Sequence, residues 1–139
     1  MKDALIADEL RVSIDSDSDI VSARQKGREL AAQCGFPSTE LAVVATAISE
    51  LARNIVRYAV RGEIVLRLID NHGGKGGVEV IAADDGPGIP DLTLAMQDGY
   101  STSGSLGLGL PGVRRLMDEF EIISDFGKGT TVTVRKWKR

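Results

Sequence analysis

The sequence has 139 residues, of which 42% are hydrophobic and 27% are charged, and this length and composition are typical of one globular domain covering residues 1–139. Aromatic residues make up only 4% and the formal net charge is −3, which argues against a nucleic-acid-binding surface. A single cysteine excludes a disulfide framework, and the lack of a long apolar run predicts a cytoplasmic protein without a membrane segment.

The first half of the chain predicts one strand and two helices. Apolar and polar residues alternate over 10–14, as in a half-buried strand. The polar run 15–19 offers several N-caps for a helix that Gly35 ends. Ser38 is expected to cap a second helix, whose apolar residues keep helical spacing to about Ala59.

The second half predicts a helix between two hairpins. The expected elements are strands at 62–70 and 76–84, a break at 85–91, a short helix at 92–97, a helix at 110–120, and strands near 121–124 and 130–136. This order predicts an α+β two-layer sandwich, in which helices cover one face of a mainly antiparallel sheet.

Glu50 and Asn54 form the first candidate site. They are four residues apart on the predicted helix and opposite its apolar stripe, so both side chains should point outward from the core. A glutamate can accept a proton, and an asparagine carbonyl can contact a hard cation such as Mg²⁺. A solvated polar stripe would have the same pattern.

The segment Asp84-Asp-Gly-Pro-Gly88 is the second candidate. Asp84 ends a mostly apolar strand, where a carboxylate can accept a hydrogen bond from a base amine. Gly86 and Gly88 allow a flat ligand to lie against the backbone. A plain tight turn would use the same residues.

The loop before the helix at 110–120 is the third candidate. Gly104, Gly107 and Gly109 bring backbone N–H groups close to a helix N-terminus, which is favourable for an anion. A connecting loop is the alternative. The G-x-G-x-x-G match at 107–112 does not follow a strand in a βαβ unit, so it does not indicate a dinucleotide site.

A fourth motif, G-K-G-T, ends at Thr130 and by itself reads as a hairpin turn. E-x-x-x-N on a helix, D-x-G-x-G after a strand, a glycine-rich loop before a helix and G-x-G-T near the end together resemble the GHKL ATPase superfamily. The resemblance covers roughly residues 9–137 and implies its two-layer sandwich. The segments SELARNIVRYA, DDGPGIPDLTLAMQDGYSTSG and LGLGLPGVRRLMDEFEI are most similar to the small serine/threonine kinases of bacterial stress signalling.

This resemblance implies ATP and Mg²⁺ as cofactors and a role for each motif. Glu50 would be the catalytic general base, and Asn54 would bind the Mg²⁺ that bridges the phosphates. The implied nucleotide-binding residues are Asn54, Asp84, Gly86, Gly88, Gly104, Gly107, Leu108, Gly109 and Thr130. Asp84, assisted by Thr130, would accept from the adenine amino group, and the glycine-rich loop would act as an ATP lid.

The resemblance also implies partners. A switch kinase of this kind phosphorylates Ser or Thr on STAS-domain proteins of the stressosome scaffold and, after release, activates a PP2C-type phosphatase. An anti-sigma factor that sequesters a sigma factor directly is the main alternative. A detached histidine-kinase ATPase domain is the third, although no helical hairpin with a phospho-accepting histidine precedes the site.

Overall fold

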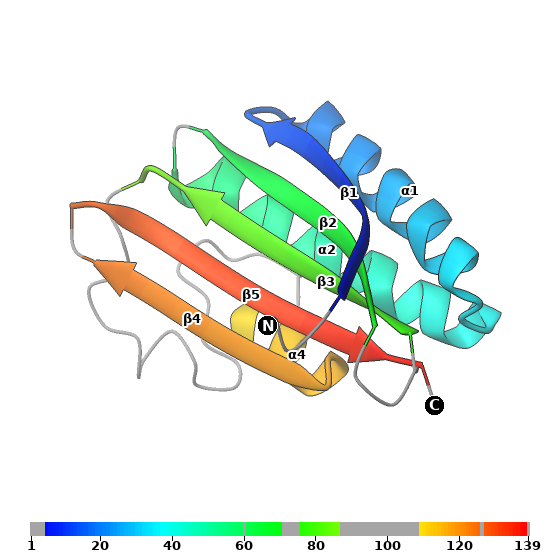
Figure 1. Ribbon diagram of the computed structural model, residues 1–139. Helices are drawn as coiled ribbons and strands as arrows, with labels where there is room; N and C mark the ends of the chain where they lie inside the picture. The colour runs from blue at the N-terminus through cyan, green and yellow to red at the C-terminus, as the bar shows by residue number, and fades with distance from the viewer. Residues whose placement is uncertain (1–4, 60, 71–75, 87–108, 126, 139) are drawn as a thin grey trace.

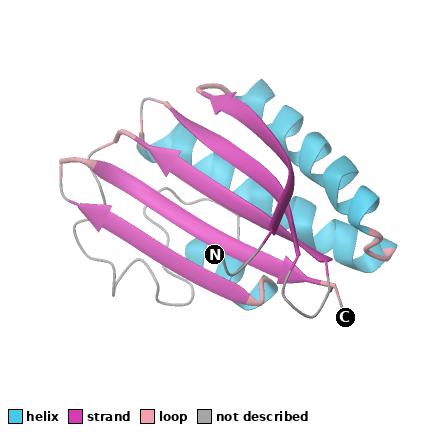
Figure 2. Ribbon diagram, in the orientation of Figure 1, coloured by secondary structure: helices cyan, strands magenta, loops and turns pink. Residues whose placement is uncertain are grey.

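The chain forms two layers, an antiparallel sheet and a set of helices that covers one of its faces (Figures 1 and 2). The computed structural model describes residues 5–59, 61–70, 76–86, 109–125 and 127–138. Its elements are β1 (Leu5–Ile14), α1 (Asp17–Cys34), α2 (Ser38–Tyr58), β2 (Gly62–Asp70), β3 (Gly76–Asp84), α4 (Gly109–Leu116), β4 (Glu119–Asp125) and β5 (Gly129–Trp137). The predicted fold class is confirmed.

Local sequence signals set the limits of α1. The backbone N–H groups of Asp15 and Ser16 donate to the Asp19 carboxylate at 3.0 and 3.1 Å, which fixes the first turn. The bond from Asp15 holds the pKa of Asp19 below its ordinary value. Gly35 ends the helix in the left-handed conformation, with φ 91°.

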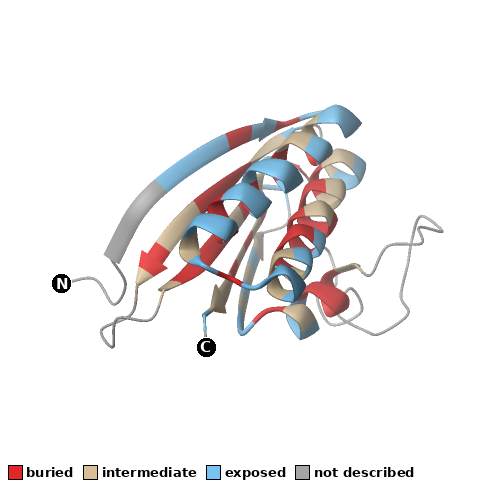
Figure 3. Ribbon diagram, turned by 90° about the vertical axis from the view of Figure 1, so that its right-hand side faces the viewer, coloured by how far each residue is buried: buried red, intermediate tan, exposed pale blue. Residues whose placement is uncertain are grey.

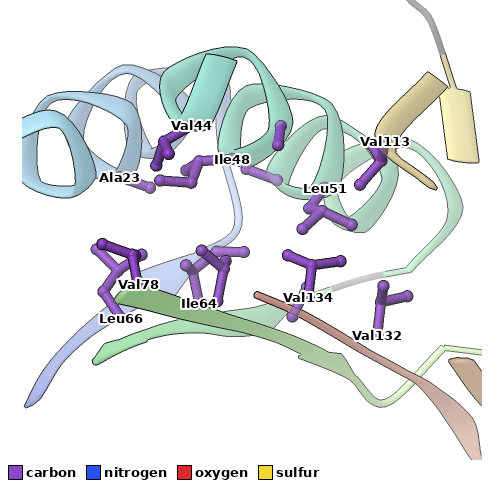
Figure 4. Packing of buried hydrophobic residues seen from close by; sticks show 14 of the residues in the cluster. Ala23, Val44, Ile48, Leu51, Ile64, Leu66, Val78, Val113, Val132 and Val134 are labelled. Atoms are coloured by element: carbon purple, nitrogen blue, oxygen red, sulfur yellow. The ribbon is translucent and has the colours of Figure 1, made fainter. Parts of the chain in front are cut away.

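Helix α2 carries the main apolar stripe toward the sheet. Val44, Ile48, Leu51 and Ile55 recur at helical spacing and are at most 2% exposed. Figure 4 shows three of these side chains facing Ile64, Leu66, Val78, Val132 and Val134 of the sheet. Figure 3 shows the buried side of each long helix turned inward. The helix begins at Ser38 with Pro37 at the N-cap, one residue earlier than the predicted Ser38 cap.

The strands run in the order β1-β2-β3-β5-β4, and every neighbouring pair is antiparallel. The hairpin strands β2 and β3 have the predicted limits. Strand β1 extends five residues before the predicted start at Leu10, because its backbone continues to pair with β2. Among the described residues, no helix is long and apolar enough to cross a bilayer.

The predicted helix 110–120 is four residues too long at its C-terminus, because α4 ends at Leu116. The chain then enters the sheet: the Asp118 backbone N–H donates to the Arg135 carbonyl at 2.9 Å, and Phe120 pairs with Val134. The Lys136 ammonium donates to the Leu116 carbonyl at 3.1 Å and satisfies the helix end. The predicted helix at 92–97 lies outside the described residues.

A charged row crosses the sheet face that the helices leave open. Its members alternate in sign over all five strands in the order Glu9, Arg67, Glu79, Arg135 and Glu119. The four ion pairs span 2.7–3.2 Å, and the central Glu79 side chain is only 6% exposed. Both carboxylate oxygens of Glu79 therefore have an arginine partner. The hydrogen bond from Arg67 lowers the pKa of Glu9.

Candidate functional site

At one end of the sheet, the face under the helices changes from apolar to polar. Two apolar rows cross β3, β5 and β4: Val80, Val134 and Phe120, then Ala82, Val132 and Ile122. Continuing the same register, the next row consists of Asp84, Thr130 and Ser124. Because side chains two residues apart share a face, these three polar groups border the apolar interior.

Asp84 is held by two backbone donors. Its Oδ1 accepts hydrogen bonds from the backbone N–H of Gly86 at 2.9 Å and of Thr130 at 3.3 Å. Among the residues that the structure describes, no hydrogen bond engages Oδ2. The site therefore presents an oriented carboxylate oxygen that can accept from an N–H donor of a ligand.

The G-K-G-T turn places Gly129 against the end of β3. Gly129 has φ +106°, which favours glycine, and a Cβ atom there would lie 2.1 Å from the Asp84 carbonyl oxygen. The backbones of these two segments can approach so closely only without a side chain at Gly129. This glycine brings Thr130 and Asp84 together.

The hydroxyl groups of Thr130 and Ser124 extend the polar row. Their Oγ atoms lie 2.8 Å apart, and the Ser124 hydroxyl donates to the Gly129 carbonyl over a long 3.5 Å. Thr130 is 9% exposed and Ser124 is half-buried. Sequence reasoning singled out Thr130 but missed Ser124. The alternation Phe120, Ile122, Ser124 within β4 was the signal that could have placed it on this face.

Glu50 does not project into solvent, and that expectation was wrong. It is 8% exposed, and α4 packs against the helix that carries it. Arg53 Nη1 lies 2.7 Å from Glu50 Oε1, and the backbone N–H of Gly109 donates to Oε2 at 3.4 Å. The carboxylate therefore lies at the N-terminus of α4, where the helix dipole favours negative charge.

Asn54 follows Glu50 by four residues on α2 and is half-buried, so it is available at the same side of the helix. The chain after β3 lies against the end of this helix: a Cβ atom on Gly86 would be 2.8 Å from the Ala59 Cβ. A Cβ atom on Gly62 would contact both Ile55 and Asp84. The C-terminal half of α2 thus borders the strand end that carries Asp84.

The remaining predicted site residues fall outside the described part of the chain. These are Gly88, Gly104, Gly107 and Leu108. Gly109 is described and begins α4, with φ 68°. The structure therefore brings Asp84, Gly86 and Thr130 together at the sheet end, and Glu50 together with Gly109 at the junction of α2 and α4.

Comparisons with known proteins agree with this architecture. The model of the histidine kinase-like ATPase domain matches residues 15–136. The chain is 52% identical over 132 residues to serine/threonine-protein kinase RsbT of Bacillus subtilis (strain 168), which covers 95% of this chain and 98% of the relative. It is 34% identical over 120 residues to an anti-sigma F factor of Thermoanaerobacter sp. (strain X514), covering 83% and 82%.

A solved structure has the same fold. The crystal structure of the RsbU and RsbW domains of Rv1364c from Mycobacterium tuberculosis superposes with a TM-score of 0.63 at 23% identity. The match covers 96% of this chain and 34% of that longer chain. At this identity the likeness concerns the fold alone, and it agrees with the sandwich that the sequence resemblance implies.

Proposed function

This chain belongs to the histidine kinase-like ATPase family, and we propose that it is a single-domain serine/threonine protein kinase that uses Mg-ATP. One observation carries the assignment: 52% identity over nearly the full length of both chains to a serine/threonine-protein kinase. Two features of the structure support it. The polar row at the sheet end offers hydrogen-bond acceptors for a nucleobase, and the carboxylate at the start of α4 can take a proton.

The part of the proposed site that would bind the adenine base consists of Asp84, Thr130, Gly86 and Gly88. Asp84 Oδ2 would accept a hydrogen bond from the adenine amino group, since Oδ1 is occupied by two backbone N–H groups. Thr130 would assist from the neighbouring strand. Gly86 and Gly88 would line the pocket of the flat adenine ring.

The phosphate end combines Asn54 with the glycine-rich segment. Mg²⁺ is commonly held by one or two protein oxygens together with substrate phosphates, and the half-buried Asn54 amide on a regular helix fits that mode. When bound, the ion would neutralise charge on the phosphates. Backbone N–H groups of Gly104, Gly107, Leu108 and Gly109 would contact phosphate oxygens.

Glu50 would act as the general base. In the proposed reaction its carboxylate takes the proton of the substrate hydroxyl, whose oxygen attacks the γ-phosphorus as ADP leaves. In this structure the Gly109 N–H donates to Glu50. A bound phosphate would take over that N–H, which leaves Glu50 Oε2 available to the hydroxyl while Arg53 still positions Oε1.

The proposed protein substrate is a Ser or Thr of a STAS-domain protein in a cytoplasmic stressosome scaffold. Release from the scaffold would then let the kinase activate a PP2C-type phosphatase. This assignment follows the similarity to RsbT and to anti-sigma F factors, which indicates a kinase of the partner-switching kind. Direct sequestration of a sigma factor is the second candidate, and the 34% identity to an anti-sigma F factor supports it.

A phosphoryl-transfer assay separates these candidates. The purified protein is incubated with Mg-ATP labelled at the γ-phosphate, together with the STAS-domain proteins of its own genome. An acid-stable label on Ser or Thr is expected. An acid-labile label would indicate phosphoryl transfer to histidine. Binding of a sigma factor to the purified protein, without labelling of any STAS protein, would favour sequestration.

A further inference from the structure

We propose that Ser124 is a positioning residue that sets the hydrogen-bond direction of Thr130 and so makes the base pocket select a purine with an amino group at position 6. The inference rests on the proposed nucleotide role of Asp84 and Thr130. It adds a residue from β4, a strand that carries none of the four sequence motifs.

The contacts of the two hydroxyl groups favour one direction. Thr130 Oγ1 and Ser124 Oγ lie 2.8 Å apart, so one donates to the other. The Gly129 carbonyl can only accept, and it lies 3.5 Å from Ser124 Oγ. One arrangement satisfies both contacts: Ser124 donates to the Gly129 carbonyl, and Thr130 donates to Ser124.

This arrangement leaves Thr130 as an acceptor toward a ligand. Its single proton is used by Ser124, so its remaining lone pairs can only accept. Asp84 Oδ2, in the same row, also accepts when the carboxylate is ionised. The two groups together match the amino group of adenine and oppose the carbonyl oxygen that hypoxanthine and guanine carry at the same position.

Because Thr130 is buried, the direction of its hydrogen bond should affect how tightly each base binds. Thr130 is 9% exposed, so little water can reach its hydroxyl and replace a mismatched partner. Sites built for a given donor or acceptor reject analogues with the opposite group more strongly than apolar pockets reject a change in size. Ser124 itself need not touch the base, because it acts through Thr130.

The test compares ATP with inosine triphosphate, which differs in the base at position 6 and in the proton on N1. Dissociation constants of both nucleotides are measured with Mg²⁺ by calorimetry for wild type and for Ser124→Ala. We expect wild type to prefer ATP, and the alanine variant to reduce that preference about tenfold, mainly through tighter binding of inosine triphosphate. Without Ser124 the Thr130 proton can turn toward the base and donate to a carbonyl.

Three controls make the result specific. Ser124→Thr keeps the hydroxyl and should keep the preference. Thr131→Ala removes a hydroxyl from β5, the strand of Thr130, but on the opposite face of the sheet, and should also keep the preference. In a Thr130→Val background, Ser124→Ala should change nothing, because the effect passes through Thr130, whereas general loosening of the hairpin would alter binding there too.

Two outcomes separate this inference from the proposed function. If wild type binds ATP but Ser124→Ala leaves the preference within about twofold of wild type, the inference is overturned and the nucleotide site stands. If wild type binds neither nucleotide, both are overturned. Circular dichroism of each variant establishes that the comparison is made between folded proteins.

Discussion

Gly27 is a point of close approach between α1 and α2, and Gly27→Ala sets two opposed effects against each other. A Cβ atom there would lie 2.1 Å from Ile48 Cδ1 but 3.5 Å from Ile48 Cγ1, and Ile48 is fully buried. Relieving this overlap costs about 1–3 kcal/mol of folding free energy. Alanine in a helix interior recovers about 1 kcal/mol relative to glycine. We therefore expect a net destabilisation of about 0–2 kcal/mol.

The clash involves one methyl group, so a second substitution should relieve it. Ile48→Val removes Cδ1 and alone costs about 0.5–1.5 kcal/mol. In the double variant the alanine methyl fills the space that Cδ1 leaves, and the helix-propensity gain remains. The double variant should unfold with a free energy close to wild type, which corresponds to a favourable coupling of about 0.5–3.5 kcal/mol.

Urea unfolding followed by far-UV circular dichroism measures the four proteins of this cycle. Ile64→Val is the matched control, since it also shortens a fully buried isoleucine. None of the three atoms nearest to the Gly27 Cβ position belongs to Ile64. Its combination with Gly27→Ala should be additive. A coupling between Gly27 and Ile48 below about 0.5 kcal/mol would refute the reasoning from geometry.

Three further predictions concern the proposed site and the cysteine. Asp84→Asn should weaken ATP binding about 10- to 100-fold in calorimetry, because a charge-assisted hydrogen bond is lost; unchanged affinity would contradict its role. Glu50→Gln, which keeps an oxygen for Arg53, should retain ATP binding and slow phosphoryl transfer about 10²- to 10⁴-fold in a labelled-ATP assay; loss of both would point to a structural or metal-binding role. Burial raises the pKa of the Cys34 thiol, so at pH 8 a disulfide reagent should label it more slowly than free cysteine and faster as the pH rises; labelling as fast as free cysteine would contradict this.

The elements with strong local signals could be predicted from the sequence. The helix at 38–58 and the strands at 62–70 and 76–84 were expected within one residue of their limits. Each of these segments has many apolar residues in a pattern typical of its element and is bounded by clear turn residues. The local preference for helix or strand therefore agrees with the tertiary packing. The order of elements was then sufficient to predict the layers.

The errors arose where tertiary contacts override a local pattern. The segment after Leu116 could continue a helix by its own spacing, but its backbone pairs with β5 instead. Glu50 belongs to a polar stripe that looks solvated on a single helix, but it is buried in the folded chain, where α4 packs against α2. Ser124 lies beside Thr130 through the register of two strands, which no single segment encodes.

The charged row on the open face of the sheet has a consequence for how the strands find their partners. Suppose β2 shifted by two residues along β3. Ile64 would then face Val80 and Leu66 would face Val78, so the interior would still consist of aliphatic pairs. On the other face, however, Glu79 would lie opposite Val65 and lose its ion pair with Arg67.

A buried carboxylate without that partner is costly, whereas the correct alignment satisfies every member of the row. The apolar interior provides most of the cohesion but cannot distinguish these two alignments. The charges on the opposite face can, since the Arg67–Glu79 pair forms only in the observed alignment of β2 with β3. The Glu79–Arg135 pair acts in the same way on β3 and β5, and it favours the alignment that brings Asp84 level with Thr130 at the end of the sheet.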